Sequence, residues 1–410
     1  MLPDPANYVG REQAYVKHYF LARYLERLIF KIASAYDEVI YVDGFSGPWQ
    51  DTDERFQDTS FGIALSTLRR AKQAWATVGN PGLRRQVQMT AHLVERDGVA
   101  FARLRALQSM FPDVRVVPHH GDFTGIAPKI ADSLSPRAFA FVFVDPKGWK
   151  VDLSAISPLI ARDNCEVVFN FMFDFINRFA LSDDAGISGQ LDHLIPGRDW
   201  RSRIRAIDKQ EQAGAGAVAG YSGPDARKGV LVEEFRKALG EAGRYRYVAD
   251  VDVLRPTKDR TLYFLIYGTR RPQGVEVFRD CHVSSLEQQS DIRGRRKLEG
   301  REKESGQKEL LTSTNQMGPD RSMVSLLREA QRARQLLHNL VPSEGPGIRW
   351  DTIWPEVLTR CVIRLTALKR IANEDRKAGI LDFPGWPTGT KRTPEDGYLV
   401  RRGHTEMLQG

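Results

Sequence analysis

YVDGFSGPWQ, residues 41–50, marks the point at which an apolar run meets an acid. The run EVIYV stops at Asp43, and Gly44 and Gly47 follow directly. In nucleotide-binding α/β sheets the first strand ends at the ligand site, and glycine lets the backbone approach a ligand closely. A simple Asp-Gly turn explains the same residues, so this segment alone leaves both interpretations open.

Further runs of β-branched and aromatic residues follow, with helical patterns between them. They are MTAHLVE, VRVVPH, FAFVFVD and EVVFNFMF, followed by YRYVADVDVL and TLYFLIYGT, which RPTKDR joins. Near-continuous apolar runs are typical of parallel strands buried on both faces, whereas the short last connection suits an antiparallel hairpin. The pattern predicts an α/β fold with a Rossmann-like sheet of five parallel strands plus an antiparallel terminal hairpin, the layout of the class I methyltransferase sheet.

Composition predicts three regions along the chain. Residues 1–288 form the Rossmann-like domain, with a Gly-rich and charged insertion at about 180–227 that is either a surface loop or a lid over the site. Residues 289–345 are a charged linker and a helix. Residues 346–410 read as a helix pair followed by strand, basic loop and strand, the plan of a winged helix.

Charge and cysteine content limit the class of protein. The net charge of +8 over 410 residues favours an anionic partner, with nucleic acid first. The 3 cysteines lie far apart, which argues against a disulfide framework and a zinc knuckle. No signal-peptide layout or membrane-spanning run is present, and no metal-binding spacing of histidines. We expect a cytoplasmic protein without a metal site.

Acids stand at the ends of four predicted strands. They are Asp43, Glu95, Asp122 and Asp145. A carboxylate at the second strand end can accept both ribose hydroxyls, for which Glu95 is favoured over Asp97. At the third strand end Asp122 can bind an adenine amino group while Phe123 covers the ring face. For S-adenosylmethionine the N–H groups of the first loop would receive the methionyl carboxylate. One such acid is usually structural, but a series along one edge predicts a nucleoside site.

The order of these motifs resembles a known family. YVDGFSGP, HLVERD, GDF, FVFVDPKGW and FNFMFDFINRF look like the three-Cys-motif partner proteins, which have a class I S-adenosylmethionine-dependent methyltransferase-like fold. These bacterial proteins are encoded beside a separate three-Cys-motif protein. The resemblance extends from about residue 15 to about residue 274, and the tail looks like the winged-helix domain of some members.

The resemblance implies a set of site residues. Those for the cofactor are Asp43, Gly44, Phe45, Ser46, Gly47, Glu95, Asp122 and Phe123; those for catalysis are Asp145, Pro146 and Gly148; and those for substrate are Lys17, Asn170 and Arg178. Lys147 and Trp149 lie in the same segment without matching the family, and we add Lys147 to the catalytic set and Trp149 to the substrate set. Asp145 is expected to orient the methyl acceptor.

Two positions depart from the family pattern. Trp49 replaces a glycine of the first loop, and Lys147 stands where an aromatic residue usually follows the Asp-Pro pair. In amino-group methyltransferases that aromatic side chain stacks on the flipped base. Either Trp149 supplies the stacking, or Lys147 faces an anionic substrate, or Lys147 is a solvated surface lysine.

Basic residues gather in the tail. Lys369 and Arg370 lie on the predicted second helix, and Lys391 and Arg392 lie on the predicted wing. They are either a solvated face or phosphate contacts of a nucleic-acid-binding domain.

The sequence therefore predicts a methyltransferase that uses S-adenosylmethionine, acts on nucleic acid and works with a three-Cys-motif protein. The alternative is a noncatalytic module of the same fold that recruits DNA or the partner protein.

Overall fold

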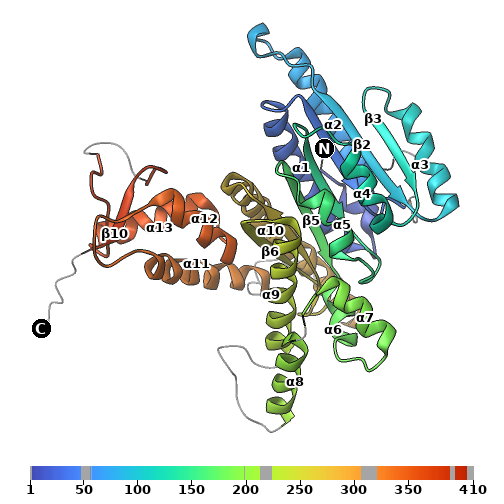
Figure 1. Cartoon of the computed structure of the whole chain (residues 1–410). Coiled ribbons are helices and arrows are strands. Elements are labelled where there is room, and N and C mark those ends of the chain that lie inside the picture. Colours follow the sequence, from blue (N-terminus) through green and yellow to red (C-terminus); the bar gives the residue numbers. More distant parts are fainter. Residues whose placement is uncertain are drawn as a thin grey trace, which may run out of the picture. The chain divides into compact units, whose positions relative to one another are not determined.

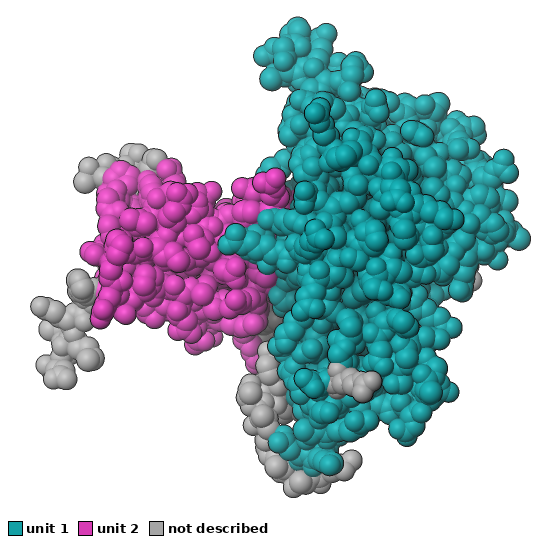
Figure 2. Space-filling model, in the orientation of Figure 1, with its two compact units in different colours: residues 1–270 teal, residues 271–410 magenta. Residues whose placement is uncertain are grey.

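The chain forms two compact units, Met1–Arg270 and Arg271–Gly410 (Figure 2). A computed structural model describes residues 2–47, 56, 58–197, 199–212, 224–305, 321–387 and 393–403. Within these residues no helix is both long and apolar enough to cross a lipid bilayer.

The first unit is built around a seven-stranded sheet (Figure 1). Its strands are β1 (Glu38–Asp43), β2 (Gln88–Glu95), β3 (Arg115–His120), β4 (Phe139–Val144), β5 (Cys165–Phe171), β6 (Tyr247–Leu254) and β7 (Thr261–Thr269). They lie in the order β3-β2-β1-β4-β5-β7-β6. The first five are parallel, and β7 runs antiparallel between β5 and β6. The predicted Rossmann-like, methyltransferase-type sheet is confirmed.

Helices alternate with these strands. They are α1 (Glu12–Ala33), α2 (Ser60–Thr77), α3 (Gly98–Met110), α4 (Phe123–Ser133), α5 (Leu153–Ile160), α6 (Phe173–Phe179), α7 (Ala185–Leu194), α8 (Asp199–Gln212) and α9 (Pro224–Gly243). The described part of the predicted insertion at 180–227 is therefore largely helical, since it contains α7, α8 and the start of α9.

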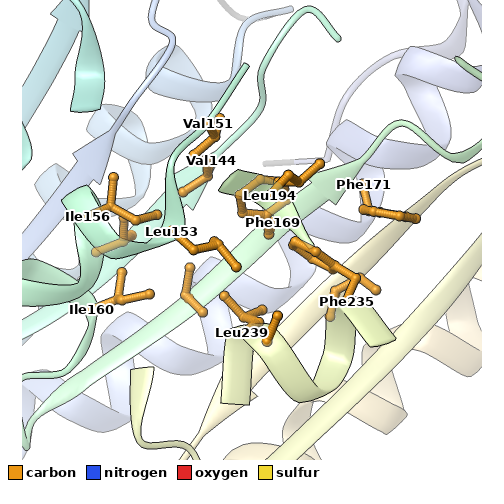
Figure 3. Packing of buried hydrophobic residues seen from close by; sticks show 14 of the residues in the cluster. Val144, Val151, Leu153, Ile156, Ile160, Phe169, Phe171, Leu194, Phe235 and Leu239 are labelled. Carbon is orange, nitrogen blue, oxygen red and sulfur yellow. The ribbon is translucent and has the colours of Figure 1, made fainter. Parts of the chain in front are cut away.

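The helices cover the sheet on both faces. Tyr24 of α1 packs on Phe141 of β4 with ring centroids 5.7 Å apart, whereas the next residue, Val142, belongs to the apolar cluster that contains Ile156 of α5. Successive side chains of a strand point to opposite faces, so α1 and α5 cover opposite sides of the sheet. On the α5 side, Phe235 of α9 also packs against β5 (Figure 3). This two-sided burial explains the nearly continuous apolar strands.

The topology fixes the place where a ligand can bind. The order of the parallel strands reverses at β1, because β2 lies on one side of it and β4 on the other. Ligands of open α/β sheets bind beyond the carboxyl ends of the strands at such a switch point. The residues that follow β1, β2, β3 and β4 are therefore the ones to examine.

The second unit contains four helices and a small sheet within its described residues. Its elements are α10 (Pro272–Ser305), α11 (Arg321–Leu340), β8 (Ile348–Arg349), α12 (Trp350–Arg360), α13 (Leu365–Lys377), β9 (Leu381–Asp382) and β10 (Leu399–Arg402). The sheet is antiparallel in the order β8-β10-β9. Its core includes Trp350, Leu358 and Leu368, all fully buried.

Helix α10 joins this second unit and differs from the predicted linker. The sequence places the domain boundary at residue 288, but α10 continues through it to Ser305, and the units divide after Arg270. The physical reason is Arg279, a buried residue whose guanidinium donates to the carbonyl oxygens of Leu358 and Thr359 at distances of 2.6 and 3.0 Å. These carbonyls end α12, where the helix leaves its acceptors without partners.

Candidate nucleoside and acceptor site

A cleft at the carboxyl edge of the sheet brings together three of the four strand-end acids. It is lined by Gly44, Phe45, Val94, Glu95, Arg96, Gly121, Asp122, Phe123, Asp145, Pro146, Lys147 and Lys150. Asp43, the fourth acid, does not line it. The predicted edge thus exists as one concave surface, although its members have different roles.

Asp43 is fully buried and holds the loop after β1. Its carboxylate accepts hydrogen bonds from the Tyr41 hydroxyl at 2.9 Å, the Ser60 hydroxyl at 2.7 Å and the Phe45 backbone N–H at 3.0 Å. Burial raises the pKa of Asp43, although these donors oppose the shift. Asp43 therefore positions the loop and the start of α2 from behind the cleft.

The N–H groups of this loop already have partners. Gly44 donates to the Phe143 carbonyl at 3.0 Å and Ser46 donates to the Val94 carbonyl at 2.9 Å. Together with the Phe45 N–H on Asp43, these bonds tie the loop to β4 and β2. If these groups bind a methionyl carboxylate as predicted, they have to give up their present partners. Gly47 is the one predicted residue of the loop that these bonds do not involve.

Gly44 serves close packing. A Cβ atom at this position would lie 2.8 Å from the Phe123 ring, closer than side chains tolerate. Phe123 is almost fully buried and meets Phe45 edge to face at 5.9 Å. The glycine thus lets the first residue of α4 pack directly under the loop, and the two phenylalanines form the apolar floor of the cleft.

Glu95 is buried at the end of β2. Its Oε1 atom accepts the backbone N–H of Asp97 at 2.6 Å, and Asp97 in turn caps α3 by accepting the Ala100 N–H at 2.8 Å. The cap explains Asp97 structurally. Glu95 is the acid that faces the cleft, as the sequence favoured.

Asp122 is exposed and caps α4. Its Oδ1 atom accepts both the backbone N–H and the hydroxyl of Thr124, at 2.9 and 2.5 Å. An N-cap aspartate satisfies donors that the first turn of a helix leaves unpaired. Asp122 therefore has a structural role that needs no ligand, while its place in the cleft keeps the predicted contact possible.

Asp145, at the end of β4, is the centre of a polar network. Lys17 of α1 forms an ion pair with Oδ2, and the amide of Asn170, the penultimate residue of β5, donates to Oδ1. Burial alone raises the pKa of Asp145, but Lys17 and Asn170 outweigh it and hold the pKa below its usual range. The carboxylate is therefore ionised. Lys17, which the resemblance assigned to substrate, has its partner inside the protein.

Asn170 offers a second acceptor beside Asp145. Its Oδ1 atom is buried and has no hydrogen-bond partner in the described part of the chain. An unpaired buried acceptor is costly unless a ligand or water supplies a donor. The Asn170 oxygen is thus an unsatisfied acceptor next to the Asp145 carboxylate, but Asn170 is buried and only Asp145 lines the cleft.

His18 supports the network from within α1. Its Nδ1 atom lies 3.0 Å from the Tyr8 hydroxyl. Burial, followed by the adjacent Lys17, lowers the pKa of His18 to about 3, so the imidazole is neutral. A neutral ring here places no second positive charge next to Lys17.

Trp149 and Lys147 lie in different surroundings, Trp149 in the core and Lys147 at the cleft. Trp149 is buried, donates from Nε1 to Gln190 at 3.1 Å, and packs on Phe175 and Phe179 with centroids 4.7 and 5.2 Å apart. Trp149 therefore anchors α6 and α7 and does not line the cleft as a stacking surface. Lys147 is exposed at the cleft, and partial burial lowers its pKa while the nearby Glu95 opposes the shift.

The cleft has two cationic residues that the sequence interpretation missed, Arg96 and Lys150. Both are exposed, as is Lys147. The sequence contains the information, since basic Arg96 follows Glu95 directly and basic Lys147 and Lys150 follow Asp145. The result is an acidic wall with a basic rim.

The remaining predicted residues lie elsewhere. Arg178 on α6 is largely exposed, with Nη2 3.8 Å from Asp174. On α13 in the second unit, Lys369 is half-buried, whereas Arg370 is exposed and lies 3.9 Å from Glu374. Trp49, Lys391 and Arg392 lie outside the described residues.

Comparisons with known proteins return structural similarities at low identity. No protein-family model matches the sequence, and no curated protein matches it. A Legionella pneumophila str. Philadelphia 1 protein of family-model DUF519 has 10% identity and a TM-score of 0.33, with 62% of this chain and 84% of that chain covered.

Two further solved structures are similar at comparably low identity, one of them a methyltransferase by name and the other with SAH bound. A precorrin-6y C5,15-methyltransferase from Geobacter metallireducens GS-15 has 13% identity, a TM-score of 0.25, and coverage of 60% of this chain and 87% of its own. The N-terminal domain of EvdMO1 with SAH bound has 11% identity, a TM-score of 0.27, and coverage of 61% and 81%. The strand order, rather than these scores, identifies the fold.

Replacing Gly44 by alanine should destabilise the first unit by about 1–3 kcal/mol, because the new methyl group displaces the Phe123 ring. Urea denaturation measures the change. Gly125→Ala on α4 is the matched control, since a Cβ there meets nothing within 4 Å; it should leave stability unchanged or raise it. Equal stability of Gly44→Ala and wild type would contradict the packing role.

Acid should weaken the first unit through His18. The folded pKa is about 3 against 6.5 for an ordinary histidine, so this stability is complete above pH 6.5 and is lost as pH falls toward 3. By pH 5 the loss is on the order of 2 kcal/mol. Urea denaturation at pH 7 and pH 5 should show a smaller pH effect in His18→Gln, which keeps a polar partner for Tyr8. An identical pH dependence in the two proteins would refute the assignment.

Proposed function

We propose that residues 1–270 bind S-adenosylmethionine and transfer its methyl group to nucleic acid, in cooperation with a three-Cys-motif protein. One observation carries this proposal: Glu95, Asp122 and Asp145 come from three successive strand ends and line a single cleft. It lies where the strand order reverses, the usual nucleoside site of such sheets. The partner protein follows from the sequence resemblance.

The residues of the cleft suit the parts of the cofactor. Glu95 can accept the ribose hydroxyls, and Asp122 can accept the adenine amino group above the apolar floor of Phe45 and Phe123. When bound, the cofactor supplies an electrophilic methyl group on a sulfonium. The positively charged sulfonium is compatible with an ionised carboxylate such as Asp145 nearby.

Asp145 and Asn170 are the groups that suit an acceptor amine. Methyl transfer depends mainly on alignment of nucleophile, methyl and leaving sulfur. The Asp145 carboxylate and the unpaired Asn170 oxygen provide two hydrogen-bond acceptors. Asp145, which lines the cleft, can orient an exocyclic N–H donor, while Lys17 keeps it ionised and the buried Asn170 holds it from behind.

A second function has its own support. Asp43 and the N–H groups of Gly44, Phe45 and Ser46 are all satisfied inside the protein. A fold that leaves these groups engaged suits a noncatalytic module that recruits DNA or the partner protein.

The second unit suits a winged-helix role in either function. Helices α12 and α13 lie in sequence between β8 and β9, and β10 completes an antiparallel sheet. The exposed Arg370 on α13 is a candidate phosphate contact. Its charge is partly offset by Glu374, which also accepts a bond from Arg334.

Titration calorimetry with S-adenosylhomocysteine tests the cofactor. Wild type should release heat on binding, and Glu95→Gln should bind about 10-fold or more weakly, because a charge-assisted hydrogen bond to ribose is lost. Glu26→Gln, which removes a partly exposed acid paired with Arg70, is the control and should bind like wild type. No heat with wild type would reject cofactor binding.

Labelled methyl transfer to DNA, RNA and the partner protein tests catalysis. Asp145→Asn should lower incorporation about 100-fold or more with cofactor binding retained. Because this substitution leaves Lys17 without its ion pair, the double variant Lys17→Met with Asp145→Asn controls for misfolding. Unchanged incorporation in a folded Asp145→Asn protein would favour the noncatalytic module.

A further inference from the structure

Phe175 is an exposed aromatic residue beside the proposed acceptor site. Its side chain is 39% accessible, whereas most large apolar residues of this unit are buried. The ring packs against Trp149 at 4.7 Å and meets Phe179 edge to face at 5.4 Å. Two aromatic neighbours therefore fix its orientation while leaving part of the ring open to solvent.

The ring lies next to the motif that lacks an aromatic side chain. A Cβ atom on Gly148 would be 3.4 Å from Cε1 of Phe175. Gly148 has a φ of +112°, a conformation that favours glycine, and follows Lys147 at the rim of the cleft. Phe175 from α6 thus occupies the space beside the segment in which amino-group methyltransferases carry their stacking residue.

A cluster of arginines surrounds the residue before Phe175. Asp174 is buried, and its carboxylate forms ion pairs with Arg255 and Arg260 of the β6–β7 connection and lies 3.8 Å from Arg178. The arginine side chains are 37%, 57% and 61% exposed, respectively.

This arginine cluster, Asp174 with Arg178, Arg255 and Arg260, carries an excess of positive charge. The same connection also contains Lys258 and Asp259, whose charges are opposite. Around Asp174 three guanidinium groups meet a single carboxylate, and all three arginine side chains keep part of their surface open to solvent. Arg178 lies three residues after Phe175, on the same side of α6.

We propose that Phe175 stacks on an unpaired base of the acceptor strand and that the arginine cluster binds the phosphates beside that base. The inference rests on the proposed function and specifies its substrate as a single-stranded or locally unpaired nucleic acid. Aromatic faces flanked by cations are the surfaces that hold such strands, because every base has a π-face and every nucleotide a charge. Asp174 fixes the guanidinium groups in place before the strand arrives, which lowers the entropy cost of binding.

The stacking role is tested by fluorescence anisotropy of a labelled 12-nucleotide single strand with the full chain. Phe175→Leu keeps apolar contact with Trp149 but removes the π-face, so it should bind about 10-fold more weakly. Phe175→Tyr keeps the ring and should bind within about twofold of wild type. Val99→Ala, at an exposed apolar residue of α3, is the surface control.

The phosphate role is tested by the salt dependence of the same binding. Arg260→Gln should reduce the slope of log Kd against log salt concentration by about 0.7, the value for one phosphate contact on a single strand. Arg255 still pairs with Asp174 in this variant, so the fold is kept. Arg70→Gln, which breaks a partly exposed pair with Glu26, should leave the slope unchanged.

Calorimetry with S-adenosylhomocysteine separates this inference from the proposed function. Absence of cofactor binding, with strand binding still dependent on Phe175, would reject the methyltransferase and keep the stacking surface. Cofactor binding with equal strand affinity in wild type and Phe175→Leu would overturn the stacking surface alone. Failure of wild type to bind the strand would also overturn it.

Discussion

The ion pair between Lys17 and Asp145 holds the carboxyl edge of the sheet together. It joins α1, which covers one face, to the end of β4 in the middle of the sheet, and Asn170 extends the connection to β5. Such a half-buried pair costs desolvation, which the additional hydrogen bond from Asn170 offsets. The neutral His18 beside it adds no competing charge. A charged carboxylate is thereby kept at the one edge where a ligand of this fold binds.

Much of the fold follows from the sequence because the sheet is buried on both faces. A segment such as FAFVFV is apolar throughout because both of its faces are covered, and the polar RPTKDR between two apolar runs suits a short turn. The boundary was harder to place, since residues 271–288 are joined to the second unit by contacts such as that of Arg279 with carbonyls about 80 residues later. The density of charged residues along the sequence does not indicate which distant residues a given arginine contacts.

The acids at the strand ends show why a site is harder to predict than a sheet. In an α/β unit the residue after a strand is also the residue before a helix, so it occupies both the ligand edge and the N-cap position. Aspartate suits both roles. Asp97 and Asp122 cap α3 and α4, while Asp43 accepts bonds from its own loop and α2. Glu95 and Asp145 are the two cleft acids that do not cap a helix.

The segment after Asp145 lacks the aromatic residue that amino-group methyltransferases use for stacking, and it shows that a motif can be completed by a residue far away in the sequence. From the sequence, a stacking side chain is expected directly after Asp145 and Pro146. The residues there are Lys147, Gly148 and the buried Trp149. In space, Phe175 of α6 packs on Trp149 and lies beside Gly148, so an aromatic ring from a later helix stands next to the motif. The lysine is then left at the cleft rim with Arg96 and Lys150. Three cationic side chains therefore line the rim of a cleft whose wall carries the acids Glu95, Asp122 and Asp145, and it is this charge arrangement that the proposed phosphate-bearing substrate has to match.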